Sequence, residues 1–425
     1  MKNIIWILFI IASGCNTTDK IGDISKETES LHQLIEKLDY FRLKKEFSSC
    51  KNTLPKTDAL YFEAILENAF NRPKQSNQLI DEFFKNSLEN DSLGIKLLQI
   101  KLNNYIHLSE YAKAKEVNEI LRQKYVPYMD SVALEDLNNT YKIWDALKDV
   151  PPQEIIKKMD VSLPIQKDKA GLSTITTNFG NATMNFVFDT GANFSVIQRS
   201  VAQGLGMKII PANFNVEAIT GLEVKSDLAV AEKLELGTIT LKNIVFLVFD
   251  DAALSFPSID YEIKGIIGFP VIRALEEIQI KMNGQLIVPK SPTQYNLNNF
   301  ALNEYVPIVK TIYKGDELRF SFDTGAQQTA LFSSFFKKYN QEIKSKYKKV
   351  TLKTGGAGGH SQMKGYVINN FKLSIGDSQA TLDSVQLYPD KIGNVDRMDG
   401  NLGQDFIQQF DTMVISFKYT SLLFR

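Results

Sequence analysis

The sequence is poor in the residues that many catalytic sites require. Of its 425 residues, only two are cysteine and three are histidine. The part of the chain that reads as β-rich holds a single histidine, His360. A zinc site built from several histidines is therefore nearly excluded there, and a nucleophile paired with histidine would have to use that one side chain. Because His360 stands in a glycine-rich stretch, we expect it to be a flap or loop residue rather than a ligand.

The chain also lacks an excess of charge of either sign. Its 49 lysines and arginines balance 49 aspartates and glutamates, and its hydrophobic fraction is 44%. Without a basic excess, nothing in the composition favours binding to nucleic acid. These values are those of ordinary globular protein, and the length predicts two to four domains of about 100–200 residues each.

The apolar run near the N-terminus, Ile4–Ile11, is too short to cross a membrane, which takes about 20 apolar residues. With its charged start and the small residues Ala12–Gly14, it fits a signal peptide over residues 1–14. The small residues before Cys15 resemble a bacterial lipobox, which implies lipidation of Cys15 and an exported, membrane-anchored lipoprotein of the cell envelope. The alternative is a plain secretory signal. Cys50 is then the only other cysteine, so we expect no internal disulfide and a buried or half-buried helical thiol.

Residues 26–150 predict an all-helical domain. Leu31, Leu34, Ile35 and Leu38 follow the spacing of one helix face. Residues 95–123 resemble a tetratricopeptide-type helical hairpin with Ala112 and Ala114 at close-packing positions, and residues 60–84 are a candidate for another. Such repeats commonly offer a concave binding face, so the domain would bind a protein partner or would only support the rest of the chain.

The pattern changes after Pro151-Pro152, which interrupts the helical region. Short apolar alternations separated by turn residues such as Gly180-Asn181 predict many short strands in barrel-like or sandwich-like lobes. Residues 289–299 form the best linker, and the similar segments 161–165 and 304–308 suggest equivalent starts for two lobes. The expected organisation is a signal peptide at 1–14, a tether at 15–25, a helical domain at 26–150, and β lobes at 160–290 and 300–425.

One short motif occurs twice in the β-rich part. Asp189-Thr190-Gly191 follows the apolar stretch 186–188, and Asp323-Thr324-Gly325 follows the similar stretch 320–322. A single copy would be weak evidence, because aspartate and glycine both favour ordinary turns. The significance of the motif therefore depends on what surrounds each copy.

Matching landmarks follow the two copies in the same order. Gly221 and Gly355 each lie 32 residues after their aspartate. Segments of the form glycine-hydrophobic-glycine begin at Gly265 and Gly400, 76 and 77 residues after their aspartates. Both copies end in apolar alternation, at 278–282 and 413–417. Landmarks in register indicate an internal duplication.

The two halves resemble the lobes of pepsin-fold aspartic proteases, and among these the retropepsin-like bacterial enzymes. Alanine follows each triplet, and a hydroxyl residue stands three positions further on, as Ala192 and Ser195 and as Ala326 and Thr329. The resemblance covers about residues 160–425. It implies an all-β, two-lobed pepsin-like domain after the all-α helical-repeat domain, and an aspartic endopeptidase acting on a peptide or protein substrate.

The resemblance makes Asp189 and Asp323 the catalytic residues. Two carboxylates held about 3 Å apart cannot both ionise, so one keeps a proton and the other can draw a proton from water. This chemistry calls for no metal and no cofactor. One chain carries both halves of the site, so we expect a monomer.

The resemblance also assigns supporting roles. Thr190 and Thr324 would hydrogen-bond to each other behind the acids. Gly191 and Gly325 would let backbone N–H groups approach the carboxylates. The remaining candidates are the hydroxyl residues Ser195 and Thr329 near the acids, and the tips of two substrate-binding flaps at Ile219, Thr220 and Gly221 and at Thr354, Gly355 and Gly356. Ordinary turn hydroxyls and solvent-exposed loops are the alternatives.

Two further expectations concern activity. Ala192 and Ala326 offer no hydroxyl to stabilise a charged carboxylate, which favours a mildly acidic to neutral optimum over a strongly acidic one. The competing hypothesis is a catalytically inactive, protease-like lipoprotein that binds peptides and uses its helical domain as an interaction module. A third possibility, compatible with an enzyme, is a zymogen whose helical domain blocks the cleft.

Overall fold

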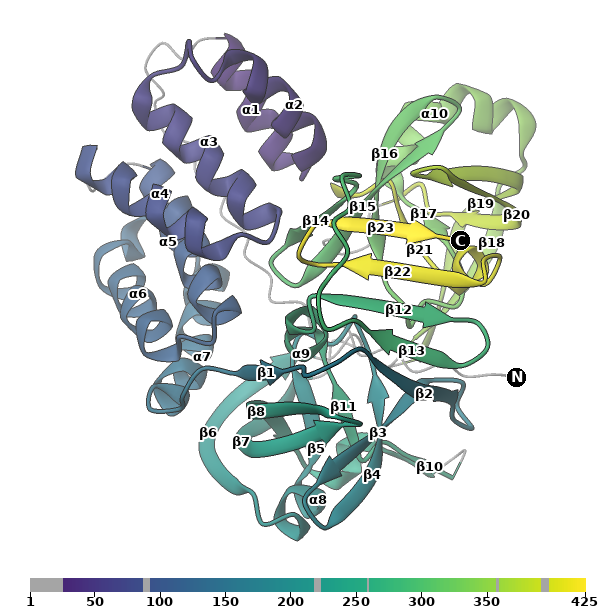
Figure 1. The fold of residues 1–425 in the computed structure, drawn as a ribbon. Helices are drawn as coiled ribbons and strands as arrows, with labels where there is room; N and C mark the ends of the chain where they lie inside the picture. The colour runs from purple at the N-terminus through teal and green to yellow at the C-terminus, as the bar shows by residue number, and fades with distance from the viewer. Residues whose placement is uncertain (1–25, 87–91, 218–222, 258–259, 357–358, 391–396) are drawn as a thin grey trace.

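A computed structural model describes residues 26–86, 92–217, 223–257, 260–356, 359–390 and 397–425. The predicted order of an all-α domain followed by an all-β, two-lobed domain is confirmed (Figure 1). The expected signal peptide, tether and lipidation site at Cys15 lie outside the described residues.

The N-terminal domain consists of consecutive helices that pack against their neighbours in the chain. They are α1 (Lys26–Glu36), α2 (Tyr40–Cys50), α3 (Lys56–Ala69), α4 (Pro73–Asn86), α5 (Ser92–His107), α6 (Tyr111–Lys124) and α7 (Ser131–Leu147), with a short 3-10 helix at Val126–Tyr128. Leu31, Leu34 and Ile35 are buried on one face of α1, as their spacing predicts. None of the described helices is both long and apolar enough to span a membrane.

The predicted close-packing positions in α6 were half right. Ala114 is fully buried, whereas Ala112 is exposed. Residues two positions apart point to nearly opposite faces of a helix, so both could not face the same neighbour. Cys50 ends α2 and is half-buried.

Strands and short helices build the rest of the chain. Lobe 1 contains β1 (Glu154–Ile156), β2 (Val161–Lys167), β3 (Ser173–Phe179), β4 (Ala182–Phe188), β5 (Ser195–Gln198), α8 (Arg199–Gly204), β6 (Lys208–Glu217), β7 (Glu223–Leu236), β8 (Ile239–Phe249), β9 (Ser255–Phe256), β10 (Tyr261–Glu262), β11 (Gly265–Ile267), α9 (Phe269–Ala274), β12 (Glu277–Lys281) and β13 (Gln285–Val288). Lobe 2 contains β14 (Phe300–Asn303), β15 (Val306–Tyr313), β16 (Asp316–Phe322), β17 (Ala330–Leu331), α10 (Ser333–Lys346), β18 (Val350–Gly356), β19 (Gly359–Ile375), β20 (Ser378–Leu387), β21 (Gly400–Leu402), α11 (Gln404–Ile407), β22 (Thr412–Ser416) and β23 (Ser421–Phe424).

The two lobes repeat one pattern of strand pairing. In lobe 1 the order β3-β4-β11-β5-β8-β7 closes on itself through a β3–β7 contact. In lobe 2 the order β15-β16-β21-β17-β20-β19 closes through a β15–β19 contact. Each lobe is therefore a small closed barrel with an apolar interior, as a duplication requires.

The pairing corrects one predicted equivalence. Residues 161–165 belong to β2, which pairs with β3, whereas Val306–Ile308 open β15, which pairs directly with the strand that leads to Asp323. In lobe 1 that position is held by β3. The similar sequences around Pro164 and Pro307 therefore occupy different strands.

The ends of the two halves meet in one sheet between the lobes. β12 pairs antiparallel with β22, with Ile278 opposite Ile415 and Ile280 opposite Met413. Equivalent residues of the two copies thus exchange places around a local two-fold axis. Figure 1 shows these strands crossing between the lobes. The shared sheet holds the halves together, and so fixes the position of one lobe relative to the other.

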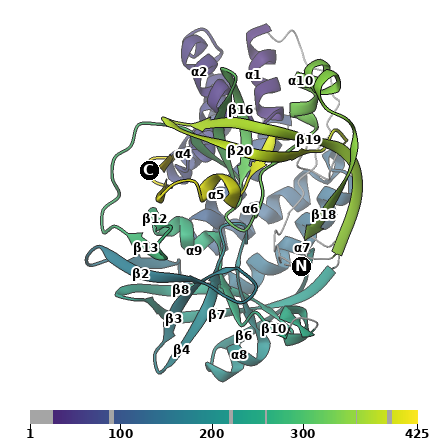
Figure 2. The same cartoon turned by 90° about the vertical axis from the view of Figure 1, so that its right-hand side faces the viewer.

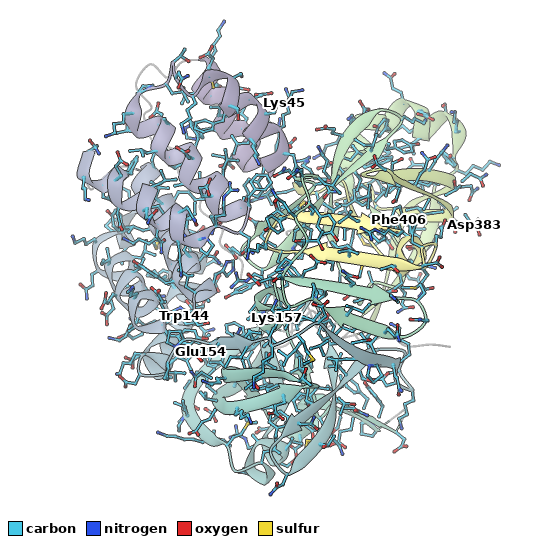
Figure 3. The ribbon with its side chains drawn as sticks, in the orientation of Figure 1. Lys45, Trp144, Glu154, Lys157, Asp383 and Phe406 are labelled. Atoms are coloured by element: carbon cyan, nitrogen blue, oxygen red, sulfur yellow. The ribbon has the colours of Figure 1, made fainter. Side chains whose placement is uncertain are left out.

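The helical domain rests against both lobes (Figure 2). On lobe 2, the Tyr40 hydroxyl of α2 donates to Asn303 Oδ1 at 2.9 Å. On lobe 1, Trp144 of α7 is 1% exposed and stacks on Phe194, with 6.3 Å between ring centroids (Figure 3 labels Trp144). Through these contacts the helical domain packs directly against both barrels.

Candidate active site

Each aspartate lies at the end of a central barrel strand. Asp189 follows β4 and Asp323 follows β16. A glycine-containing strand runs parallel beside each of them, with Ile267 next to Phe188 in lobe 1 and Leu402 next to Phe322 in lobe 2. The Asp189 N–H donates to the Ile267 carbonyl at 3.1 Å. Both turns are therefore held by a rigid sheet from behind.

The structure brings the two carboxylates together. A Cβ atom built on Gly191 would lie 3.2 Å from Asp189 Oδ1 and 3.1 Å from Asp323 Oδ1, so both oxygens border the same small volume. The Gly191 N–H donates to Asp189 Oδ1 at 2.8 Å, and the Gly325 N–H donates to Asp323 Oδ1 at 2.7 Å. Glycine is needed at position 191 because a side chain there would crowd both acids.

Thr190 and Thr324 lie behind the carboxylates and join the lobes. Their hydroxyls form a hydrogen bond of 2.8 Å, and the Thr324 N–H also lies 3.4 Å from Thr190 Oγ1. Thr190 is 1% exposed. The bond therefore lies at the lobe interface, beneath the cleft and largely covered on the Thr190 side, where it restrains the separation of the two acids.

A double-mutant cycle tests this bond. Thr190→Val or Thr324→Val alone should lower the free energy of unfolding by about 1–3 kcal/mol, because each strands a polar group without its partner. The double variant should cost less than the sum of the single variants. Urea unfolding of the three variants measures this, and strictly additive costs would argue that the hydroxyls act independently.

Ser195 and Thr329 do not reach the carboxylates through any described hydrogen bond. Ser195 Oγ accepts from the Gly268 N–H, and Thr329 Oγ1 accepts from the Gly403 N–H, each at 3.1 Å. They tie each aspartate turn to the glycine segment that crosses behind it. Ser195 and Thr329 therefore help to position the aspartate turns and do not contact the carboxylates through a described hydrogen bond.

Lobe 2 has an extra support that the sequence analysis missed. Asp405 accepts hydrogen bonds from the Thr329 N–H at 2.9 Å and from its hydroxyl at 2.7 Å. The equivalent position in lobe 1 is Pro270, two residues after Gly268 as Asp405 is after Gly403. The only available signal was this difference between otherwise matching copies.

The electrostatics of the pair differ between its members. Asp323 is 5% exposed, whereas Asp189 is half-buried. Burial raises the pKa of Asp189 to about 6. Burial, and then the charge of Asp189, raise the pKa of Asp323 to about 8. Between these values the pair holds a single proton, which is the state that acid–base chemistry requires.

Asp189 and Asp323 line an open cleft. Its described walls come from the two lobes. Apolar Leu172, Ile263 and Ile266 line one side, Gln327 belongs to lobe 2, and Lys167 brings the one cationic side chain among the lining residues. No sequence pattern marks these residues as a group, because the turns that converge to form the cleft lie far apart in the chain.

The predicted flap residues fall in two places. Ile219, Thr220 and Gly221 lie outside the described residues. The second set belongs to β18, whose backbone pairs with β19 as far as Gly356 opposite Gly359, with Gly355 opposite His360. Thr354 is paired in the same ladder. The backbone there is a long hairpin, and contact with a substrate remains a prediction.

Among the described residues, no group of three or more histidine, cysteine, aspartate or glutamate side chains is placed so that it could hold a metal ion.

Comparison with known proteins adds sequence evidence. The model of a family described as "Aspartyl protease" matches residues 174–271 and 309–406, and each match contains one aspartate triplet. Among solved structures, the chain is similar to a retropepsin-like aspartic protease from Rickettsia conorii, at 19% identity over 32% of this chain and 91% of that chain, with a TM-score of 0.22. The comparison with curated proteins returned no match.

Proposed function

We propose that the chain is an aspartic endopeptidase in which Asp189 and Asp323 activate water to hydrolyse peptide bonds, since two of its segments match the aspartyl protease family model. The observation that carries the proposal is the convergence of the two carboxylates above Gly191 in an open cleft. Both acids and both threonines are present, as turnover requires.

The chemistry follows from the single shared proton. The charged carboxylate takes a proton from a water molecule, whose oxygen attacks the peptide carbonyl carbon. The protonated carboxyl donates to the carbonyl oxygen and stabilises the tetrahedral intermediate. Transfer of a proton to the amide nitrogen then allows the C–N bond to break, which yields a carboxylic acid and an amine. No covalent bond to the protein forms.

The cleft suits an extended peptide. Its apolar wall at Leu172, Ile263 and Ile266 fits an apolar side chain next to the bond that is cut. The hairpin of β18 and β19 would pair with the peptide backbone, strand to strand. Peptide or protein is therefore the proposed substrate class.

The pH dependence should be bell-shaped. We expect kcat/KM to fall below about pH 6, where the base becomes protonated, and above about pH 8, where the acid loses its proton. The optimum then lies near neutrality. Initial rates on one peptide across pH 3–10 measure this, with stability checked at each pH. A maximum near pH 2–3 would contradict the assignment of both raised pKa values.

The direct test of function uses a mixed peptide library. We expect the purified chain at neutral pH to generate new peptide termini that mass spectrometry detects, without added metal. Cleavage that persists in a chelator is the predicted result. Peptides that are retained but never cut would instead support the alternative of a peptide-binding protein.

A further inference from the structure

Helix α7 contacts lobe 1 at an edge strand. Among the described strands, β6 pairs with β7 alone, so its other edge is open to a different partner. The side chain of Asn139 in α7 takes that place. Its amide donates to the Asn215 carbonyl at 2.6 Å, and the Asn215 N–H donates back to its oxygen at 2.9 Å. One asparagine thus mimics the two hydrogen bonds of a neighbouring strand.

Further contacts from α7 surround this pair. Lys142 Nζ donates to the Asn213 carbonyl at 3.3 Å. Phe214, which is 1% exposed, and Val216 bury their side chains in the same apolar cluster as Trp144. The cluster also contains Phe194, five residues after Asp189, on which Trp144 stacks. The helix therefore contacts both β6 and the turn that carries one catalytic acid.

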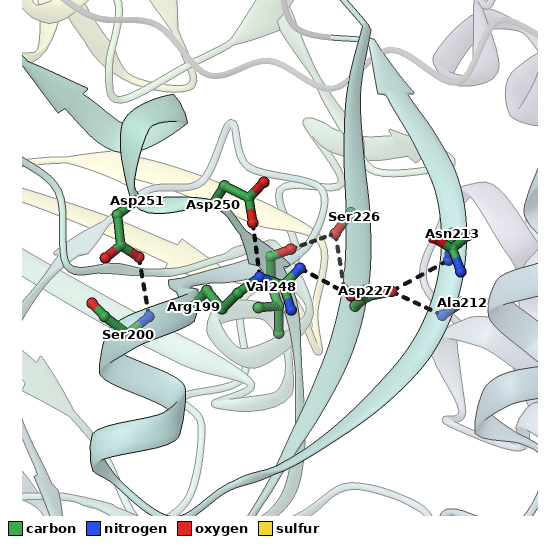
Figure 4. Close-up of polar contacts among 9 residues, drawn as sticks. All are labelled: Arg199, Ser200, Ala212, Asn213, Ser226, Asp227, Val248, Asp250 and Asp251. Atoms are coloured by element: carbon green, nitrogen blue, oxygen red, sulfur yellow. Dashed lines mark hydrogen bonds and ion pairs between the residues drawn. The ribbon is translucent and has the colours of Figure 1, made fainter.

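Lobe 1 holds the same part of β6 from its own side. The ladder with β7 shifts register between Ile210 and Phe214, which leaves a bulge. Asp227 of β7 accepts from the N–H groups of Ala212 and Asn213 in that bulge, at 3.1 and 3.4 Å (Figure 4). The bulge fixes where β6 bends, and bulges of this kind re-aim a strand.

Arg199 in turn holds the Asp227 side chain in place. Arg199 at the start of α8 donates to Asp227 at 2.9 Å and to Asp250 at 2.7 Å (Figure 4). Burial would raise the pKa of Asp227, but the hydrogen bonds from Ala212 and Arg199 outweigh it and lower the pKa. The carboxylate is therefore charged at neutral pH, and it anchors the bulge opposite the helix.

We propose that α7 is a positioning element of the active site: Asn139 fixes α7 to β6, and Trp144 of the same helix supports the turn that carries Asp189. The helical domain then supports catalysis from behind instead of blocking the cleft. Two observations agree with this. The described walls of the cleft come from the lobes, and α7 touches the turn after Asp189 from the buried side.

This inference rests on the proposed function for its kinetic consequence, but not for its structural one. Asn139→Ala removes both hydrogen bonds to Asn215. Asn139→Asp keeps the acceptor and loses the donor. The matched control is Asn138→Ala on the same helix, since Asn138 accepts from Arg122 within the helical domain. Hydrogen exchange of the segment 208–217 in the full chain provides a readout that needs no activity.

We expect exchange of this segment to rise by about threefold to tenfold in Asn139→Ala, less in Asn139→Asp, and not at all in Asn138→Ala. kcat should fall with KM nearly unchanged, because the turn that carries Asp189 loses support while the described walls of the cleft stay in place. Unchanged exchange would overturn the role of Asn139 in restraining β6, whatever the activity. Faster exchange with an unchanged kcat would overturn the positioning role. A parent that cuts no peptide would defeat the proposed function, and the positioning role with it.

Discussion

Asp323→Asn is expected to lower kcat by about 10³-fold or more, and Asp189→Asn should do the same. An amide neither accepts the proton of water nor supplies one to the substrate carbonyl. Because the acids act as one unit, the double variant should be scarcely worse than either single variant. Steady-state initial rates of cleavage of one peptide from the library measure this. Activity that survives either substitution would refute the two-carboxylate mechanism.

The thermal stability of Asp323→Asn shows whether its lost activity comes from the missing carboxyl or from a failure to fold. The folded pKa of Asp323, about 8, lies above the ordinary value of 3.8. The folded state therefore binds this proton more tightly, and stability is lost as the pH rises through the folded pKa. The amide of Asp323→Asn cannot become charged, so at pH 8 this variant should have a higher melting temperature than the parent. At pH 4 the parent carboxyl is also neutral in the folded state, and we expect no such gain. The control Asp383→Asn changes an exposed aspartate of lobe 2 and should alter neither rate nor stability (Figure 3).

The second large effect is predicted at the glycines behind the acids. A Cβ atom on Gly268 would lie 2.3 Å from the Phe194 carbonyl oxygen, and one on Gly403 would lie 2.4 Å from the Gln328 carbonyl carbon. Both obstacles are backbone atoms that cannot rotate away. Gly268→Ala and Gly403→Ala should each destabilise the fold by about 3 kcal/mol or more.

These substitutions should also impair catalysis in whatever protein still folds. The N–H groups of Gly268 and Gly403 donate to Ser195 and Thr329, so a displaced segment disturbs both aspartate turns. Gly204→Ala is the matched control, because no atom other than those of its chain neighbours and the backbone of its own helix lies within 4 Å of its Cβ position in α8. Thermal unfolding should show it to be neutral or stabilised by about 0.5–1 kcal/mol. Gly268→Ala or Gly403→Ala melting like the parent would contradict the packing described here.

The sequence predicted much of the fold because its signals are local or repeated. The spacing of Leu31, Leu34 and Ile35 defines a helix face over a few residues, and the burial of that face follows. The duplicated triplets and glycine segments predicted two matching lobes, since equivalent sequences adopt equivalent strand pairings. The error at residues 161–165 arose where a short similarity was unrelated to the spacing from the aspartate.

Other features had no signal of this kind. Asp405 supports one lobe alone, where the copy has Pro270. The contact between Asn139 and Asn215 joins residues 76 positions apart, through an asparagine that reads as any polar residue on a helix surface. The cleft residue Lys167 likewise reads as an ordinary strand end, and only the assembled structure shows that it lines the cleft.

By itself the sequence determined that this protein has a helical domain, two copies of one β lobe and an aspartate at the same turn of each copy. Only the tertiary structure decided that the carboxylates meet above Gly191, and that α7 lies against lobe 1. The reason is physical: periodicity and turn preferences act over a few residues. The meeting of residues 134 positions apart, such as Asp189 and Asp323, depends on the apolar burial summed over two barrels and the sheet between them.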